Sequence, residues 1–199
     1  MIANIKNSLG NLVVALCLLL LFSCHKNEQY YYFAYFTDKD GSVPESYIIK
    51  EITTNKKQRS ETNFMFTPKG ELKSKSVNVF QITNTGLKKQ INQQNSYIFK
   101  PYLDIRSNEY INFKYTDESL NDFASTSFCF VGEKNLTLDN KKYANAYRFK
   151  KEQGKINTVT SFVYLDRNFV LILEEFIEGE RPYYRIERID STLTFMLKK

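Results

Sequence analysis

Apolar and polar side chains alternate with a period of two along much of the chain, which predicts β-strands. The pattern is clearest from Ser127 to Ile189, where short segments rich in Val, Ile, Phe and Tyr are separated by turn-forming pairs. Asp139-Asn140 and Gln153-Gly154 are two such pairs. Because connections this short join antiparallel neighbours, the pattern predicts a meander of hairpins.

The expected strands can be placed individually. In the first part of the chain they cover residues 30–36, 47–52, 63–67, 71–83, 97–103 and 110–115. In the last part they cover residues 127–131, 134–138, 141–149, 158–165, 169–177, 183–189 and 192–197. The wholly polar residues 55–60 predict a solvated loop.

Two segments favour short helical turns instead. Leu87 and Ile91 are four residues apart, which suits one or two helical turns over residues 87–95. Thr116 precedes apolar residues at helical spacing, Phe123 and Ala124 among them, and so predicts a short helix. We therefore expect a mainly β fold: an antiparallel curled sheet or open barrel with a few short helical turns. In strand rhythm alone it resembles the lipoprotein-carrier proteins, which wrap an incomplete β-barrel around a helical plug.

Residues 30–36 stand out because both faces of the predicted strand are aromatic. Such a strand is either covered on both sides or presents one face to a ligand or partner. The candidate face for a hydrophobic ligand or a protein consists of Tyr30, Tyr32 and Phe36, together with Ala34. The opposite face consists of Tyr31, Phe33 and Tyr35.

Residues 12–22 form an unbroken apolar run after a start that carries one charged side chain, Lys6. This is typical of a cleaved secretory signal. The run is too short for a helix across a hydrocarbon core of roughly 30 Å. It ends in Leu21-Phe22-Ser23-Cys24, which resembles the lipobox of bacterial lipoproteins. The resemblance implies cleavage before Cys24, a diacylglycerol on its thiol and acylation of the new amino terminus.

These features divide the chain into a signal peptide (residues 1–23), a lipidated tether (24–29) and one β-rich domain (30–199). Two or more acyl chains on Cys24 would hold the protein firmly to a membrane. No Asp directly follows Cys24, so the familiar inner-membrane retention signal of lipoproteins is missing. The expected location is therefore the cell envelope, at the outer membrane facing the periplasm.

The composition agrees with a β-rich domain, with 14 Tyr and 16 Phe but no Trp and only 7 Gly. The formal net charge of +6 comes from lysines spread along the chain in pairs such as Lys88-Lys89 and Lys150-Lys151. Nucleic-acid binding requires a clustered basic face. We therefore expect a solvated surface and no nucleic-acid partner.

The residues available for catalysis are few. The single histidine, His25, adjoins the lipidated cysteine, and Cys129 lies between two phenylalanines where we expect it to be buried. Neither a metal-ligand cluster nor a glycine-rich nucleotide loop is present in the sequence, which predicts no cofactor and no metal. Carboxylates gather around Glu174, whose expected partner across the last hairpin is Arg185, with Leu173 opposite Ile186.

These observations leave three hypotheses. The first is a non-enzymatic envelope lipoprotein that binds a lipid, a hydrophobic molecule or an envelope protein. The second is a hydrolase of envelope glycans or lipids that uses a pair of carboxylates. The third is a protein-interaction or immunity-type inhibitor lipoprotein with a surface patch as its site.

Overall fold

The computed structural model describes residues 27–37, 43–93, 96–117, 122–138, 140–154, 159–178 and 183–189. The signal, the motif at Cys24 and the expected strand over residues 192–197 lie outside these ranges. Within the described part of the chain, no helix has the length and apolar character needed to cross a membrane.

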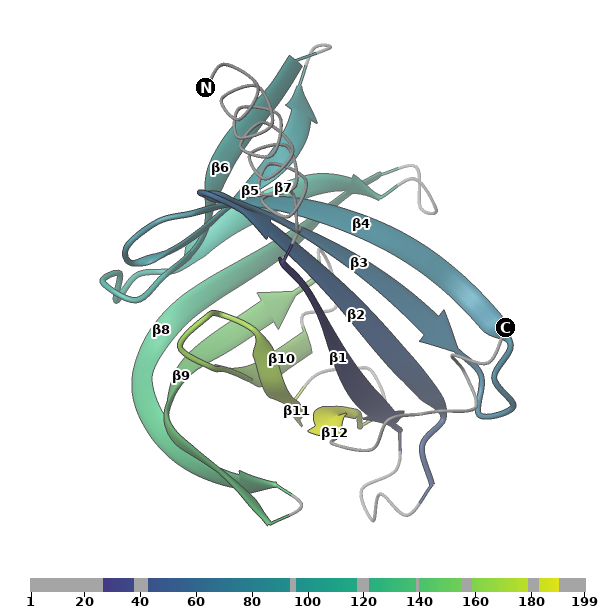
Figure 1. Ribbon diagram of the computed structural model, residues 1–199. Coiled ribbons are helices and arrows are strands. Elements are labelled where there is room, and N and C mark those ends of the chain that lie inside the picture. The colour runs from purple at the N-terminus through teal and green to yellow at the C-terminus, as the bar shows by residue number, and fades with distance from the viewer. Residues whose placement is uncertain are drawn as a thin grey trace, which may run out of the picture.

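All the strands belong to one antiparallel sheet (Figure 1). Its first half contains β1 (Asn27–Phe36), β2 (Ser46–Asn55), β3 (Gln58–Phe66), β4 (Leu72–Ile82), β5 (Gly86–Gln93) and β6 (Ser96–Asp104). Its second half contains β7 (Ile111–Asp117), β8 (Asp122–Leu138), β9 (Lys141–Gln153), β10 (Val159–Leu165), β11 (Leu171–Glu178) and β12 (Arg185–Ile189).

The strand order is β6-β5-β4-β3-β2-β1-β12-β11-β10-β9-β8-β7. Each half is thus a meander of consecutive hairpins, and the pairing of β1 with β12 joins the two halves. The sheet curls until its outer strands, β6 and β7, come close to each other. In Figure 1 the long strands β1 to β4 form one wall, and the curved β8 and β9 wrap around the other side. The result is a nearly closed, barrel-like sheet, as the right-handed twist of strands favours.

The prediction of a mainly β, antiparallel curled sheet is confirmed, but the helical turns over residues 87–95 are wrong. This segment contains β5, which pairs with β6 so that Leu87 lies opposite Leu103 and Ile91 opposite Ile98. Residues four apart share a face of a strand as well as of a helix, so the spacing alone did not separate the two. Gly86 permits this pairing, because a Cβ there would overlap the Leu103 carbonyl.

The helix expected after Thr116 is also wrong where the structure describes it. Phe123 and Ala124 lie in β8 and pair with Thr116 and Tyr115 of β7. Residues 118–121 lie outside the described ranges. Similarly, the polar loop expected at residues 55–60 is a tight turn at Lys56-Lys57 between β2 and β3.

The register of the last hairpin differs by one residue from the prediction. Glu174 lies opposite Ile186, and Arg185 lies opposite Glu175. Since side chains alternate between faces, a shift of one residue moves each side chain to the other face. Glu174 therefore points into the sheet interior instead of pairing with Arg185.

Two apolar clusters form the core. The larger one joins both halves of the sheet and contains Phe80, Leu87, Leu103, Phe128, Phe149, Val163, Leu165 and Phe169. The smaller one joins β9, β10 and β11 and contains Ala146, Tyr164, Ile172 and Leu173. All the strands and both clusters that the structure describes lie within residues 27–189.

Candidate functional site

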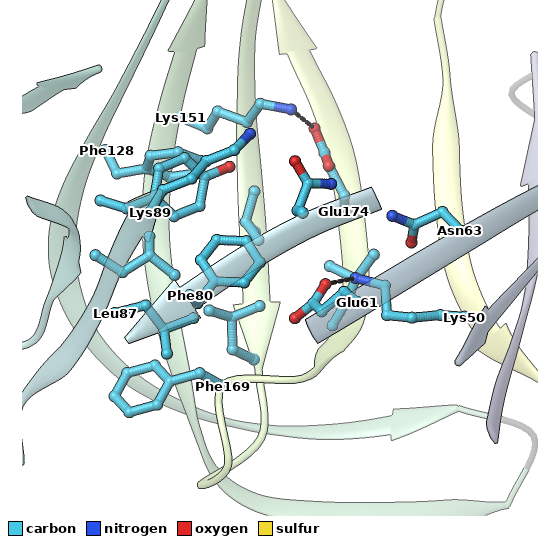
Figure 2. A pocket seen from close by; sticks show the side chains of 16 residues that line it. Lys50, Glu61, Asn63, Phe80, Leu87, Lys89, Phe128, Lys151, Phe169 and Glu174 are labelled. Atoms are coloured by element: carbon cyan, nitrogen blue, oxygen red, sulfur yellow. Dashed lines mark hydrogen bonds and ion pairs between the residues drawn. The ribbon is translucent and has the colours of Figure 1, made fainter. Parts of the chain in front are cut away.

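The curled sheet encloses a cavity of about 180 Å³ between its two halves (Figure 2). One part of its wall is the larger apolar cluster, including Phe80, Leu87 and Phe128. The other part is polar and carries three lysines, two glutamates and two asparagines: Lys50, Lys89, Lys151, Glu61, Glu174, Asn63 and Asn78. We call this space the inner cavity. The wall of the inner cavity is therefore amphipathic.

Glu61 on β3 is held by two cations. The Lys50 ammonium lies 2.6 Å from Glu61 Oε2, and the Arg59 guanidinium forms an ion pair with Oε1. Burial alone would raise the pKa of Glu61, but Lys50 and Arg59 outweigh it and hold the pKa below its usual range. Glu61 is therefore ionised at neutral pH.

Glu174 on β11 occupies a similar position on the other half of the sheet. Its Oε1 accepts hydrogen bonds from Lys151 Nζ at 2.8 Å, Tyr184 Oη at 2.9 Å and Ser161 Oγ at 3.0 Å. Burial opposes ionisation, but Lys151 and these donors lower the pKa of Glu174 overall. Burial and the carboxylate raise the pKa of Tyr184, which stays a neutral donor.

Lys89 differs from the other two lysines of the inner cavity because it has no carboxylate partner. Among the described residues its ammonium makes ring contacts only, 5.4 Å from the Tyr102 centroid and 5.3 Å from that of Phe113. Burial lowers the pKa of Lys89, and Lys151 and Lys50 lower it further, against the effect of Glu61. In Figure 2, Lys89 and Lys151 point to the same end of the inner cavity.

The carboxamides of Asn63 and Asn78 face the same space. The register places Asn63 opposite Lys50 and Asn78 opposite Glu61, and antiparallel partners share a face of the sheet. Within the described part of the chain, neither carboxamide forms a hydrogen bond inside the protein. Both can therefore donate to, or accept from, a molecule in the inner cavity.

The turn between β10 and β11 closes the apolar part of the inner cavity. Arg59 donates to the carbonyl oxygens of Asn168 at 2.6 Å and Phe169 at 3.1 Å, which ties this turn to the first half of the sheet. Arg188 donates to Asp166 Oδ2 at 3.1 Å from β12. Phe169 has a positive φ of 57°, which its surroundings must stabilise. These bonds hold the Phe169 ring against the cavity.

A second cavity of about 480 Å³ adjoins the first and shares Lys151 and Glu174 with it. We call it the outer cavity. Its other lining residues combine aromatic and aliphatic side chains with polar ones: Tyr35, Thr37, Met65, Gln153, Val159, Tyr183, Tyr184 and Ile186. Its volume falls within the range of roughly 300–1,000 Å³ that is usual for small-molecule sites.

The geometry limits the reactions that the interior could support. Acid–base hydrolysis of a glycoside by two carboxyl groups needs one of them protonated. Glu61 and Glu174 both have lowered pKa values, and each is ion-paired to a lysine. The described residues also contain no group of three or more His, Cys, Asp or Glu side chains suited to a metal ion. Neither glutamate is therefore protonated to act as a general acid at neutral pH.

The aromatic face predicted on β1 lies away from both cavities. Tyr30 is 48% exposed and Tyr32 is partly buried, whereas Phe36 is 6% exposed beneath the Arg185 guanidinium, 4.8 Å from its ring. The opposite face of β1 points inward, and its Tyr35 lines the outer cavity. A ligand or partner on the Tyr30 face stays a prediction, as does lipidation of Cys24.

Cys129 is only half-buried, so its prediction as a buried residue is wrong. Its Sγ lies 3.2 Å from the Asn108 carbonyl oxygen. Its neighbours Phe128 and Phe130 belong to, or pack against, the larger apolar cluster. Alternation along β8 therefore turns Cys129 away from that cluster.

Sequence reasoning missed most of the polar residues of the inner cavity. Lys89 and Lys151 belong to lysine pairs that were expected on a solvated surface. The signal that could have found them is their position within strands, because adjacent residues of a strand point to opposite faces. One lysine of each pair must therefore point inward: Lys88 is exposed, whereas Lys89 faces the inner cavity.

Comparisons with known proteins found a similarity of fold. The structure is similar to the crystal structure of a candidate lipoprotein from Parabacteroides distasonis, with a TM-score of 0.58. The match covers 82% of this chain and 94% of the other chain, at 10% sequence identity. The two proteins thus share a barrel-like antiparallel architecture. No protein-family model and no curated protein matches the chain.

Proposed function

We propose that this protein is a lipid-anchored protein of the bacterial cell envelope whose curled sheet binds a hydrophobic or amphipathic molecule in its interior. The observation that carries the proposal is the pair of adjoining cavities inside the sheet. They combine apolar walls with a few convergent polar groups, which is the usual composition of a ligand site.

The anchor is proposed from the sequence around Cys24, and it agrees with the description of the Parabacteroides distasonis protein as a candidate lipoprotein. Because β1 begins at Asn27, acyl chains on Cys24 would tether the sheet through residues 24–26 and not 24–29, a segment that reaches at most about 10 Å when extended. The sheet would therefore lie close to the membrane surface. Outer-membrane attachment facing the periplasm belongs to the same proposal.

We also propose that the protein is not an enzyme. The support is the charge state of Glu61 and Glu174, because two ionised carboxylates provide no general acid at neutral pH.

The anchor is tested by Cys24→Ser in the native host. The variant should keep its signal peptide and lose the acyl chains, which mass spectrometry of the purified protein detects directly. A processed Cys24→Ser protein that still partitions with membranes would contradict the lipoprotein assignment.

The binding function is tested on residues 25–199, secreted without the acylated cysteine and purified without detergent. Native mass spectrometry should detect a co-purifying apolar or amphipathic molecule that is released on unfolding. Val163→Trp fills the inner cavity, since Val163 lines it, and should reduce ligand occupancy. Consistent absence of any ligand, with no binding of added apolar probes, would count against the proposal.

A further inference from the structure

The lining of the inner cavity carries one positive charge more than its carboxylates balance. Three lysines and two glutamates line the inner cavity, and the Lys50 and Lys151 ammonium groups each lie within 3 Å of a glutamate oxygen. Among the described residues, Lys89 has ring contacts alone. It is partly buried, and an ammonium withdrawn from water without a counter-ion is unfavourable in the empty protein.

The inner cavity also contains neutral side chains that can bind an anion. Asn63 and Asn78 line the same cavity, and their carboxamides have no hydrogen bond within the described residues. Their amide nitrogens can donate to a carboxylate, and the ammonium adds a charge-assisted hydrogen bond. The carboxylates of Glu61 and Glu174 are already taken up by Lys50 and Lys151, so they repel a further anion less than free carboxylates would.

The apolar part of the wall restricts the size of the ligand's apolar group. Phe80 lies directly opposite Lys89 across β4 and β5, and Phe128 lines the same space. A cavity of roughly 150 Å³ can hold a benzene molecule, and the inner cavity measures about 180 Å³. It therefore has room for a charged head with a small apolar group, and any longer apolar part would have to extend into the outer cavity.

We propose that the inner cavity binds the carboxylate of an amphipathic monoanion through Lys89, Asn63 and Asn78, with the adjoining apolar part of the ligand against Phe80 and Phe128. This deepens the proposed function and rests on it: binding in the interior is the general claim, and a negatively charged ligand head is the new one.

The test compares three probes that differ in one property each: hexanoate, 1-hexanol and acetate. Residues 25–199 are labelled with ¹⁵N and titrated at pH 7, with amide shifts giving both the affinity and the place of binding. Hexanoate should bind at least tenfold more tightly than 1-hexanol or acetate. Shifts should concentrate on the strands that carry Lys89 and Asn78, which are β5 and β4.

Substitutions then test which side chains bind the carboxylate. Lys89→Met removes the charge and leaves an unbranched side chain only one heavy atom shorter. It should weaken hexanoate binding about tenfold while leaving 1-hexanol binding unchanged. Lys88→Met is the matched control, because Lys88 is exposed on the same strand and should have no effect. Asn78→Leu should weaken hexanoate binding as well, by a few-fold.

Three other outcomes would refute part or all of the proposal. If 1-hexanol binds as tightly as hexanoate and Lys89→Met changes neither, the anion site is refuted while the apolar binding function stands. If acetate binds as tightly as hexanoate, the amphipathic part of the proposal is refuted. If none of the probes binds and native mass spectrometry finds no ligand, both the anion site and the proposed function fail.

Discussion

The Lys151 ammonium on β9 lies 2.8 Å from Glu174 Oε1 on β11, and these two side chains form part of the wall of both cavities. The intervening strand, β10, supplies Ser161, which donates to the same carboxylate oxygen. The pair thus links three neighbouring strands at the point where the inner and outer cavities meet. Its removal should affect stability as well as binding.

Glu174→Gln should destabilise the protein by about 3 kcal/mol, because it leaves Lys151 as an uncompensated buried charge. Urea denaturation of residues 25–199, followed by far-UV circular dichroism, measures the change in the free energy of unfolding. Glu175→Gln is the matched control, since Glu175 lies opposite Arg185 on the other face of β11. It should change the free energy of unfolding by no more than about 0.5 kcal/mol. Equal effects of the two substitutions would contradict the buried pair.

The stability of the protein should fall in acid. Glu61 and Glu174 both have pKa values below that of an unfolded glutamate, which is about 4.3. Below that pH the unfolded state binds more protons than the folded state, so the free energy of unfolding decreases as the pH is lowered. Urea midpoints at pH 7, 4 and 3 should therefore decline steadily. Glu61→Gln and Glu174→Gln combined should flatten this decline, and an unchanged slope would refute the assignment.

Lys89→Met should stabilise the empty protein by about 1 kcal/mol, because an unpaired ammonium is replaced by an apolar side chain of similar length. The wild type should also gain stability as the pH rises towards the ordinary lysine pKa of about 10.4. In that range the folded Lys89, whose pKa burial lowers, binds fewer protons than the unfolded one. Thermal unfolding at pH 7 and pH 9 measures both effects. A Lys89→Met protein that is less stable than the wild type would contradict this account.

Two arginines near the β10–β11 turn should differ strongly in their contribution. Arg59 is 3% exposed and donates to the carbonyl oxygens of Asn168 and Phe169. Arg59→Met should lower the free energy of unfolding by about 3 kcal/mol or more. It leaves Glu61 with a single cation, and it leaves two carbonyl groups without their donor. Arg167→Met should cost less than about 1 kcal/mol, because the ion pair of Arg167 with Glu133 is largely exposed. Similar costs for both would overturn the proposed role of Arg59.

The sequence was sufficient to predict the fold class, because alternation and short turns both indicate antiparallel hairpins. It was not sufficient for registers and faces. The one-residue difference at the last hairpin placed Glu174 inside the sheet, where it pairs with Lys151 from a strand two positions away. Pairing partners that far apart in sequence cannot be inferred from local spacing, since both side chains also fit an exposed strand.

The same limit applied to the candidate site. Glu61 shares its strand face with polar residues, whereas Lys50 and Lys89 each share theirs with apolar residues, so local sequence gave these three side chains no common environment. Glu61 is buried and the two lysines are partly buried because the sheet curls around them, and the curl depends on how all the described strands pair. By contrast, the aromatic strand at residues 30–36 could be predicted from the sequence, because both of its faces are aromatic in any register.

The pairing of β1 with β12 has a consequence for the order of folding. Tyr32 lies opposite Ile189, so β1 obtains one of its two neighbours only when β12 has been made. Contacts so distant in sequence slow folding and leave a strand edge exposed in the meantime. Until β12 is made, the edge of β1 is therefore open to pairing with a strand other than its native partner.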